Sequence, residues 1–390
     1  MISYGRQHID EQDIQAVVEC LRSSALTQGP MVETFEQAVS AYTGARYAVA
    51  VSSGTAALHI AALAAGICPG KAILTSPITF VATSNAAIYA GGSVHFADID
   101  PESININPVD IATKLEKYPE IKVISPVHFS GLTCDMVAIK KLADDAGAIV
   151  IEDAAHALGS RYLDGSIVGS CRYSLMTVFS FHPVKSITTG EGGMITTNDE
   201  KIYRKLLRLR SHGINKDADT YFFPDNAKTN GLSNPWYYEM QEIGFHYRIT
   251  DIQCALGVSQ LKKLDSFVQR RREIVNSYDA AFKNRKLIRP AQLIGRNESA
   301  HHLYPLRINF EEAGVSRAQF MGELRRNGII TQVHYIPVTI QPFYHNLGIR
   351  AVDYPQANKY YDEALSIPLY VDLSDKQQES IINLILELLG

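Results

Sequence analysis

A single lysine, Lys185, follows an apolar segment and precedes a turn of small residues in the stretch VFSFHPVKSITTGEGG, Val178–Gly193. Lysine is almost never fully buried without a partner, because its charged amine is strongly hydrated. Two interpretations are open. Either the aliphatic stem lies along apolar surface and the ammonium reaches water, or the amine lies in a cleft where desolvation lowers its pKa and makes it nucleophilic towards a carbonyl. The first arrangement is much the commoner, so the second needs support from other residues.

A carboxylate at the end of an apolar run is the second candidate. The segment AIVIEDAAHALGS, Ala148–Ser160, is typical of a central parallel strand that is buried on both faces and ends at Asp153. A buried aspartate needs a cation to offset the cost of leaving water, and a protonated pyridine nitrogen would serve. The alternative is an aspartate that caps a turn or helix. His156 lies in the following turn and could hydrogen-bond the same ring.

A third stretch could bind a phosphate. Tyr47–Val51 predicts a short strand, Ser52–Thr55 is a turn of small residues, and Ala56–Ala65 predicts a helix. Such a turn points free backbone N–H groups and the positive end of the helix dipole at one spot. An ordinary capped helix is the alternative, since serine and threonine are common caps. The segment is neither a Walker loop nor a GxGxxG fingerprint, so it gives no support to a nucleoside triphosphate.

Together these stretches indicate a site for pyridoxal phosphate. Phe80 follows the predicted strand Ile73–Pro77, where the carboxyl end of a strand meets the crevice of an open α/β sheet, and could cover a planar ring or fill the core. Lys185 would form an imine with the aldehyde, Asp153 would keep the pyridine nitrogen protonated, and the turn would hold the phosphate. Ser180 could add a hydroxyl to that phosphate.

These motifs resemble the nucleotide-sugar aminotransferases of the fold-type I pyridoxal-phosphate enzymes over nearly the whole chain. The resemblance rests on VSSGTAALH, the Phe80 segment, IEDAAHALGS and SFHPVKSITTGEGGMITTND. Within the family, LTQGP, RSHGI, NPWYYEMQEIGFHYRITDIQCALG and QVHYIP are most similar to members of the pseudaminic-acid pathway, which serves surface-glycan or flagellin glycosylation. Those members aminate carbon 4 of a UDP-linked 4-keto-6-deoxy-N-acetylhexosamine, with glutamate as the usual donor.

The resemblance implies a role for individual positions. Lys185 matches the family's Schiff-base lysine, Asp153 the partner of the pyridine nitrogen, and His156 the residue near the ring oxygen. The stacking aromatic matches Phe80, and the phosphate contacts match Gly54, Thr55 and Ser180. The nucleotide-sugar region matches Tyr4, Leu26, Thr27, Gln28, Gly29, His334 and Tyr335.

One position departs from the family pattern. His246, in GFHYRIT, stands where the family often has an asparagine that reaches the cofactor phosphate of the neighbouring subunit. A histidine can also donate a hydrogen bond there. The resemblance therefore implies a homodimer whose active site is shared between subunits. The segment Asn215–Trp236, without hydrophobic period, is expected to be a long surface loop that reaches towards the partner's site.

The chain is long enough for two domains. Its 390 residues exceed the roughly 250 to 300 at which single cores stop growing. We expect a large, mostly parallel mixed-sheet domain over residues 1–250, and a linker helix with a small α+β domain over residues 251–390. In the second, apolar periods predict a half-buried strand over Tyr304–Phe310, a helix over Ser316–Arg326 and a strand over Ile329–Tyr335. Ser374 and Gln377 predict a capping box before the last helix.

Composition excludes several classes of protein. Hydrophobic residues make up 46% and charged residues 20%, and the net charge of −4 does not suggest a nucleic-acid or membrane partner. Five cysteines without paired spacing argue against disulfides or a metal cluster. With no signal peptide and no apolar stretch of about 18 residues, we expect a cytoplasmic protein. The basic run Arg270–Arg272 is expected on a solvated helix face or at a subunit contact.

Two other functions remain open. The first is an aminotransferase for another nucleotide-linked keto sugar, such as a dTDP- or GDP-sugar. The second is a non-catalytic member, in which the fold binds cofactor or sugar as a sensor or scaffold. Some members of the wider family replace the lysine with histidine and dehydrate sugars instead. This chain keeps both Asp153 and Lys185, which favours catalysis of amino transfer.

Overall fold

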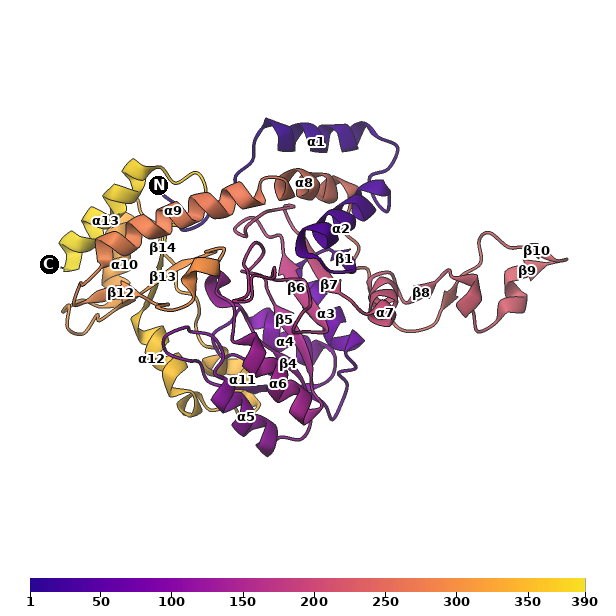
Figure 1. Ribbon diagram of the computed structural model, residues 1–390, viewed down its shortest axis with the longest axis horizontal. Coiled ribbons are helices and arrows are strands. Elements are labelled where there is room, and N and C mark those ends of the chain that lie inside the picture. Colours follow the sequence, from indigo (N-terminus) through magenta and orange to yellow (C-terminus); the bar gives the residue numbers. More distant parts are fainter. Residues whose placement is uncertain (390) are drawn as a thin grey trace.

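A seven-stranded mixed sheet forms the centre of the computed structural model, which describes residues 1–389 (Figure 1). Its strands lie in the order β1-β7-β6-β5-β4-β2-β3, and all of them point in the same direction except β7. The predicted α/β fold with a large, mostly parallel sheet is therefore confirmed. The strands are β1 (Tyr47–Val51), β2 (Ala72–Thr75), β3 (Ser93–Phe96), β4 (Ile121–Ser125), β5 (Ile149–Asp153), β6 (Met176–Ser180) and β7 (Gly193–Thr197).

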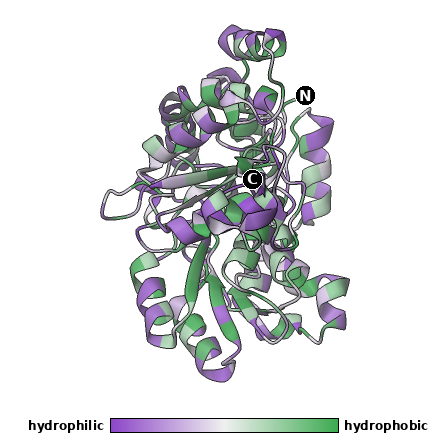
Figure 2. Cartoon of the chain, turned by 90° about the vertical axis from the view of Figure 1, so that its right-hand side faces the viewer, coloured by the Kyte–Doolittle hydropathy of each residue, from purple (hydrophilic) through white to green (hydrophobic). Residues whose placement is uncertain are grey.

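Helices cover both faces of this sheet, which explains why its strands are apolar throughout. Along β5, Val150 packs into the cluster that contains α2 and α6, whereas Ile151 packs into the cluster that contains α3 and α4. Strands inside the molecule are largely green, and therefore hydrophobic, in Figure 2. The helices before and between the parallel strands are α2 (Pro30–Thr43), α3 (Gly54–Ala64), α4 (Val81–Tyr89), α5 (Pro108–Lys117) and α6 (Met136–Ala146), and α7 (Glu200–Arg210) follows β7.

A second, antiparallel sheet lies in the C-terminal part, in the order β12-β13-β14. Its strand β13 (Tyr304–Ile308) is buried along its whole length, so the expectation of a half-buried strand is wrong. The reason is tertiary: Tyr304 and Leu306 pack in the third core cluster, while Arg307 pairs with Glu363 and donates to the carbonyl of Pro101. The other strands are β12 (Ile288–Pro290) and β14 (Ala364–Ile367), and the accompanying helices are α10 (Arg317–Arg326) and α13 (Asp375–Leu389).

Another C-terminal prediction fails. Residues 329–335 form no regular strand, because only Ile329 bridges to Ile2 and only Gln332 bridges to Ser366. The capping box before α13 is confirmed, since Ser374 and Gln377 exchange hydrogen bonds between side chain and backbone. Residues 338–360 belong to the predicted small domain but pack on the large sheet. Five of them are part of its core: Val338, Tyr344, Tyr354, Ala357 and Tyr360. The division at residue 250 stays a prediction.

The helices α1 (Glu11–Arg22), α8 (Asp251–Leu261) and α9 (Leu264–Phe282) lie along the top of the molecule in Figure 1. Lys263 ties α1 to the junction of α8 and α9 through ion pairs with Asp10, at 2.7 Å, and Asp13, at 2.6 Å. The sequence predicts the basic run Arg270–Arg272 on a solvated helix face or at a subunit contact. The prediction of a solvated face is wrong for Arg271, which is 2% exposed. Its guanidinium donates to the carbonyl of Leu369 at 3.0 Å and so links α9 to the C-terminal part.

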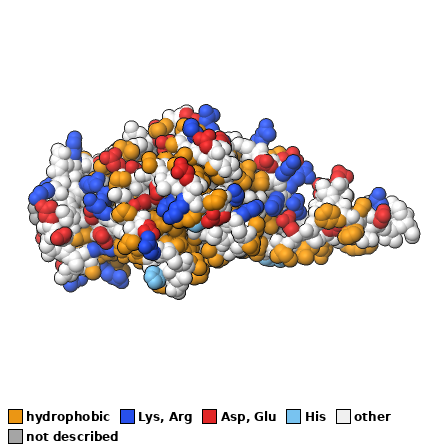
Figure 3. Space-filling view, turned by 90° about the horizontal axis from the view of Figure 1, so that it is seen from below, with side chains coloured by type: hydrophobic (Ala, Val, Ile, Leu, Met, Phe, Trp, Pro, Cys, Tyr) orange, Lys and Arg blue, Asp and Glu red, His pale blue; other side chains and the backbone are white. Residues whose placement is uncertain are grey.

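The segment after α7 projects from the body as an arm (Figure 1). The expected loop holds short elements: β8 (Ile214–Asn215), β9 (Lys228–Thr229), β10 (Leu232–Ser233) and, beyond its end, β11 (Glu239–Met240), with β10 paired to β9 and β11 to β8. Glu239 fixes the arm by accepting the backbone N–H groups of Phe222 and Phe223. Figure 3 shows hydrophobic side chains on the arm. The exposed hydrophobic residues of the arm include Phe222, Phe223, Leu232, Trp236, Tyr238 and Met240. Within residues 1–389, no helix has the length and apolarity of a membrane span.

Candidate active site

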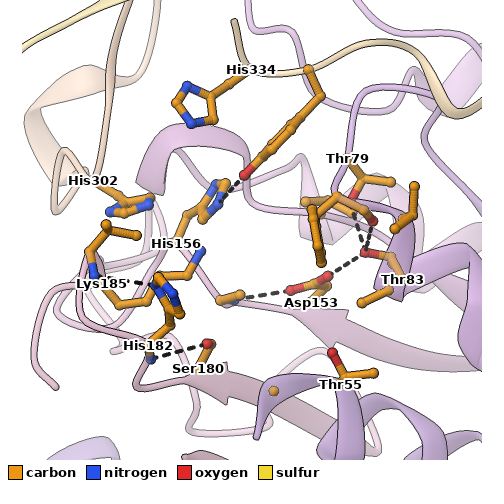
Figure 4. Close-up of a pocket in the computed structure, with 18 of the residues that line it drawn as sticks. Thr55, Thr79, Thr83, Asp153, His156, Ser180, His182, Lys185, His302 and His334 are labelled. Carbon is orange, nitrogen blue, oxygen red and sulfur yellow. Dashed lines mark hydrogen bonds between the residues drawn. The ribbon is translucent and has the colours of Figure 1, made fainter. Parts of the chain in front are cut away.

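The carboxyl ends of the parallel strands surround a cavity of about 610 Å³ (Figure 4). This is the edge of a parallel sheet at which ligands bind in open α/β folds. The structure brings most of the predicted site residues together at its wall: Tyr4, Gly54, Thr55, Phe80, Asp153, His156, Ser180, Lys185, His334 and Tyr335. The stretch Leu26–Gly29 and His246 do not line this cavity.

The turn between β1 and α3 has the features of a phosphate site. Ser53 is the N-cap, and its Oγ accepts the N–H of Ala56 at 3.1 Å. The N–H groups of Gly54 and Thr55 precede the first helical hydrogen bond and have no acceptor within residues 1–389. A Cβ on Gly54 would lie 2.9 Å from Cβ of Ser180, so only glycine lets β6 approach the turn this closely. The free N–H groups and the Ser180 hydroxyl thus face one end of the cavity.

Asp153 ends β5 with its carboxylate at the cavity wall, and it is 5% exposed. Its Oδ1 accepts the N–H of Ala155 at 3.1 Å, and its Oδ2 accepts the hydroxyl of Thr83 at 2.6 Å. The Thr83 hydroxyl has one proton, so at its 2.7 Å contact with Thr79 it accepts. A chain of hydrogen bonds therefore runs in one direction, in which Thr79 donates to Thr83 and Thr83 donates to Asp153. This chain fixes the plane of the carboxylate.

The Lys185 side chain enters the same cavity (Figure 4). Its amine forms no hydrogen bond or ion pair within residues 1–389. Burial lowers its pKa to about 8, although the negative charge of Asp153 opposes this shift. A lysine with this pKa is about half neutral near pH 8, and the neutral amine is the form that attacks carbonyls and takes up protons. The second of the two interpretations of Lys185 fits the structure.

Three histidines line the cavity on the side of the C-terminal part: His156, His302 and His334 (Figure 4). Burial lowers the pKa of all three, to about 3 for His334, and the charge of Lys185 acts in the same direction. They are therefore neutral at physiological pH. The rings of His156 and His302 have centroids 4.4 Å apart. His302 was not predicted from the sequence, because no strand end or small-residue turn marks it.

Two parts of the predicted site, Leu26–Gly29 and His246, lie outside the cavity. Gly29 donates its N–H to Oδ2 of Asp251 at 2.7 Å, and the carbonyl of Leu26 accepts the N–H of Asp251, so the loop 26–29 is anchored at the start of α8. His246 is exposed, and its backbone bridges to Ser211. Their predicted roles towards nucleotide sugar and cofactor phosphate stay predictions. Sequence reasoning in turn missed further cavity residues, among them Thr79, Thr83, Glu191, His302, Gln332 and Gln341.

The chain belongs to the DegT/DnrJ/EryC1/StrS aminotransferase family, whose model matches residues 7–386. It is 40% identical over 383 residues to the spore coat polysaccharide biosynthesis protein SpsC of Bacillus subtilis, covering 98% of this chain and 95% of that protein. It is 37% identical over 382 residues to a UDP-4-amino-4,6-dideoxy-N-acetyl-beta-L-altrosamine transaminase of Campylobacter jejuni, covering 98% and 96%. A solved structure of Helicobacter pylori PseC, an aminotransferase of pseudaminic acid biosynthesis, superimposes with a TM-score of 0.89 at 31% identity and covers 100% of this chain and 99% of that one.

The protein is accordingly a sugar aminotransferase that depends on pyridoxal phosphate. The residues present fit this cofactor. The cavity holds unpaired backbone donors at one end, a fixed carboxylate in its wall and an amine without a partner, and these are the groups that a phosphate, a pyridinium nitrogen and an aldehyde require.

Proposed function

We propose that this aminotransferase moves an amino group from glutamate to the C4 keto group of a UDP-linked 4-keto-6-deoxy-N-acetylhexosamine, in the biosynthesis of pseudaminic acid. The observation that carries the proposal is the cavity lined by both Lys185 and Asp153. The choice of sugar rests on the similarity to the Campylobacter transaminase and to PseC. The second candidate is transfer to another nucleotide-linked keto sugar, such as a dTDP- or GDP-sugar, because the chain is also similar to SpsC, a protein of spore coat polysaccharide biosynthesis.

Each cavity residue has a task in this proposal. The cofactor supplies an aldehyde that carries the amino group and a ring that accepts electrons. Lys185 would hold that aldehyde through its amine, with loss of water, and once released its Nζ would take the proton from the α-carbon of glutamate. Positioned proton transfer of this kind contributes about a hundred- to ten-thousandfold to the rate. Asp153 would pair with the ring nitrogen, and Phe80, which lines the cavity and is 59% exposed, would cover the ring.

The remaining cofactor contacts are proposed at the phosphate. The N–H groups of Gly54 and Thr55 and the hydroxyl of Ser180 bind it, and His246 reaches it from the neighbouring subunit. His156 lies on the side of the ring oxygen. Tyr4, His334 and Tyr335 contact the sugar nucleotide from the same chain, because all three line the cavity. The stretch Leu26–Gly29 also contacts the sugar nucleotide in this proposal.

We further propose that the protein is a homodimer. Among the described residues that line the cavity, Lys185 is the one lysine and there is no arginine. Glutamate, the proposed amino donor, and the nucleoside diphosphate of the sugar substrate are anions that need additional cations for tight binding. Both the arm, with Trp236 73% exposed, and α1, with Leu21 53% exposed, present apolar side chains that a second copy would cover. The free cysteines fit a reducing compartment, which we propose is the cytoplasm.

The test is direct. Purified protein loaded with pyridoxal phosphate is incubated with glutamate and, separately, UDP-, dTDP- and GDP-linked keto sugars, and products are identified by mass spectrometry and NMR. We expect an amino group at C4 of the UDP-linked N-acetylhexosamine and none with the Lys185→Ala variant. Amination of only a dTDP- or GDP-sugar would establish the second candidate instead, and conversion of no keto sugar would contradict both.

A further inference from the structure

A chain of hydrogen bonds with a fixed direction leads into the cavity through His156. The backbone N–H of Ser130 lies 3.3 Å from Nδ1 of His156. A backbone N–H can only donate, so Nδ1 is the acceptor. His156 is buried and its pKa is lowered well below the ordinary value, by burial first and then by the charge of Lys185, so the ring holds a single proton. That proton must be on Nε2.

The direction continues to Tyr335. Its hydroxyl lies 3.0 Å from Nε2 of His156, and since Nε2 carries the proton, the Tyr335 oxygen accepts. Burial raises the pKa of Tyr335, with the negative charge of Asp153 as a further cause, so the phenol keeps its own proton. Within residues 1–389 this hydroxyl has no other partner. Because Tyr335 lines the cavity, its O–H is free to point at a ligand there.

The donor at the start of the chain is held by several contacts. Ser130 has a φ of 60°, and its side chain donates to the carbonyl of Leu303 at 2.7 Å while its carbonyl accepts the N–H of His302 at 2.9 Å. Gly131, with a φ of 98°, has no room for a side chain: a Cβ would lie 3.0 Å from the N–H of His301 and 3.1 Å from the carbonyl of His156. A left-handed residue at this place is costly and persists only where the surroundings impose it. The Ser130 N–H is thus locked onto His156.

We propose that Tyr335 is a hydrogen-bond donor to an oxygen atom bound in the cavity, and that His156 is the positioning residue that turns the Tyr335 proton towards that oxygen. The oxygen belongs either to the cofactor ring or to the sugar, as its keto or a neighbouring hydroxyl group. This inference rests on the proposed function. The chain begins at an amide that does not release its proton, so Tyr335 cannot be reprotonated along it. Its role is to hold an oxygen, and no proton is transferred.

The direction of the chain is tested first, in the cofactor-loaded enzyme. Proteins labelled with ¹⁵N at histidine are compared by NMR, and the His156 signals are assigned as those missing from His156→Gln. We expect a neutral ring with its proton on Nε2. A proton on Nδ1, or on both nitrogens, would overturn the inference, because Tyr335 would then not be required to accept.

The consequence is tested with Tyr335→Phe, which keeps the ring and loses the hydroxyl. The matched control is Tyr42→Phe, which loses a hydroxyl bonded to Asp265; neither residue lines the cavity, so this variant is expected to change neither binding constant. Thermal unfolding verifies that both variants are folded. One neutral hydrogen bond corresponds to about a three- to tenfold change in binding. For Tyr335→Phe we therefore expect a rise of about three- to tenfold in the dissociation constant of pyridoxal phosphate if the acceptor is the ring oxygen. If the acceptor is on the sugar, we expect this rise in KM for the keto sugar instead.

The pattern of kinetic constants separates this role from others. The kcat of Tyr335→Phe should change less than the affected binding constant, since the hydroxyl donates a hydrogen bond and transfers no proton. A folded variant with both binding constants unchanged would overturn the inference, as would a loss confined to kcat. If the unmodified protein aminated no keto sugar, the proposed function would fail independently, while the cofactor dissociation constants and the NMR result would still test Tyr335.

Discussion

Thr83 provides a quantitative test of how the site fixes its carboxylate. Its hydroxyl donates to Oδ2 of Asp153 at 2.6 Å, and Asp153 is 5% exposed, so water cannot replace a lost donor freely. A hydrogen bond to a charged group contributes about 1.5–3 kcal/mol, whereas a bond between neutral groups contributes about 0.5–1.5 kcal/mol. Thr83→Val, which keeps the shape and removes the hydroxyl, should lower the free energy of unfolding of the cofactor-free protein by the first amount.

Two comparisons make this prediction specific. Thr79→Val removes only the neutral bond between Thr79 and Thr83, so its cost should lie near the smaller figure of about 0.5–1.5 kcal/mol. Thr113→Val is the control, because Thr113 bonds only to a carbonyl of its own helix α5 on the surface. Its effect should stay within about 0.5 kcal/mol. Urea denaturation followed by circular dichroism measures all three.

A double-mutant cycle then attributes the cost to the charge. In the Asp153→Asn background the acceptor at position 153 is neutral, so the cost of Thr83→Val should fall to about 0.5–1.5 kcal/mol. Thr83→Val alone should also bind pyridoxal phosphate more weakly, since Asp153 loses the hydrogen bond that orients it. The reasoning is refuted if Thr83→Val costs no more than Thr113→Val, or if its cost is equal in both backgrounds.

Three further predictions follow from the cavity. Lys185→Ala should abolish amino transfer and the absorption of the lysine-bound cofactor while the cofactor still binds non-covalently, and full activity of this variant would rule out the assigned role. The pKa of Lys185 is about 8 in the folded protein, below its ordinary value of 10.5, so between these pH values the unfolded chain binds more protons than the folded chain. The free energy of unfolding of the cofactor-free protein should therefore rise with pH in this range. Lys185→Met should lack this rise when urea denaturation at pH 7 is compared with that at pH 10. Gly54→Ala should weaken cofactor binding, because the new Cβ would meet Ser180 at 2.9 Å, whereas Gly322→Ala in α10, where a Cβ meets nothing within 4 Å, should leave it unchanged in the same titration.

Much of the site could be predicted because its parts are local. The turn Ser52–Thr55, Asp153 and Lys185 each follow an apolar strand within a short stretch of chain, and parallel strands bring their carboxyl ends to one edge of a sheet. Residue type, strand end and fold class were therefore enough to place these groups around one cavity. The fold class itself follows from the alternation of strands and helices.

The partners of those groups could not be predicted in this way. Thr83 is 70 positions from Asp153 along the chain, and Tyr335 is 179 positions from His156. Neither pair has a local pattern, because both depend on how separate elements pack. The same holds for Arg271, whose neighbours in the sequence are charged but whose side chain meets carbonyl groups of the C-terminal part.

The sequence by itself determined the fold class and the positions of Lys185, of Asp153 at a strand end and of the small-residue turn Ser52–Thr55, since each follows from a periodicity or a strand end. Only the tertiary structure decided the direction of the hydrogen bonds at Asp153 and Tyr335, the neutral state of the histidines and the lowered pKa of Lys185. The physical reason is that desolvation and hydrogen-bond geometry depend on which distant groups surround an atom, and the order of residues does not specify that until the chain has folded.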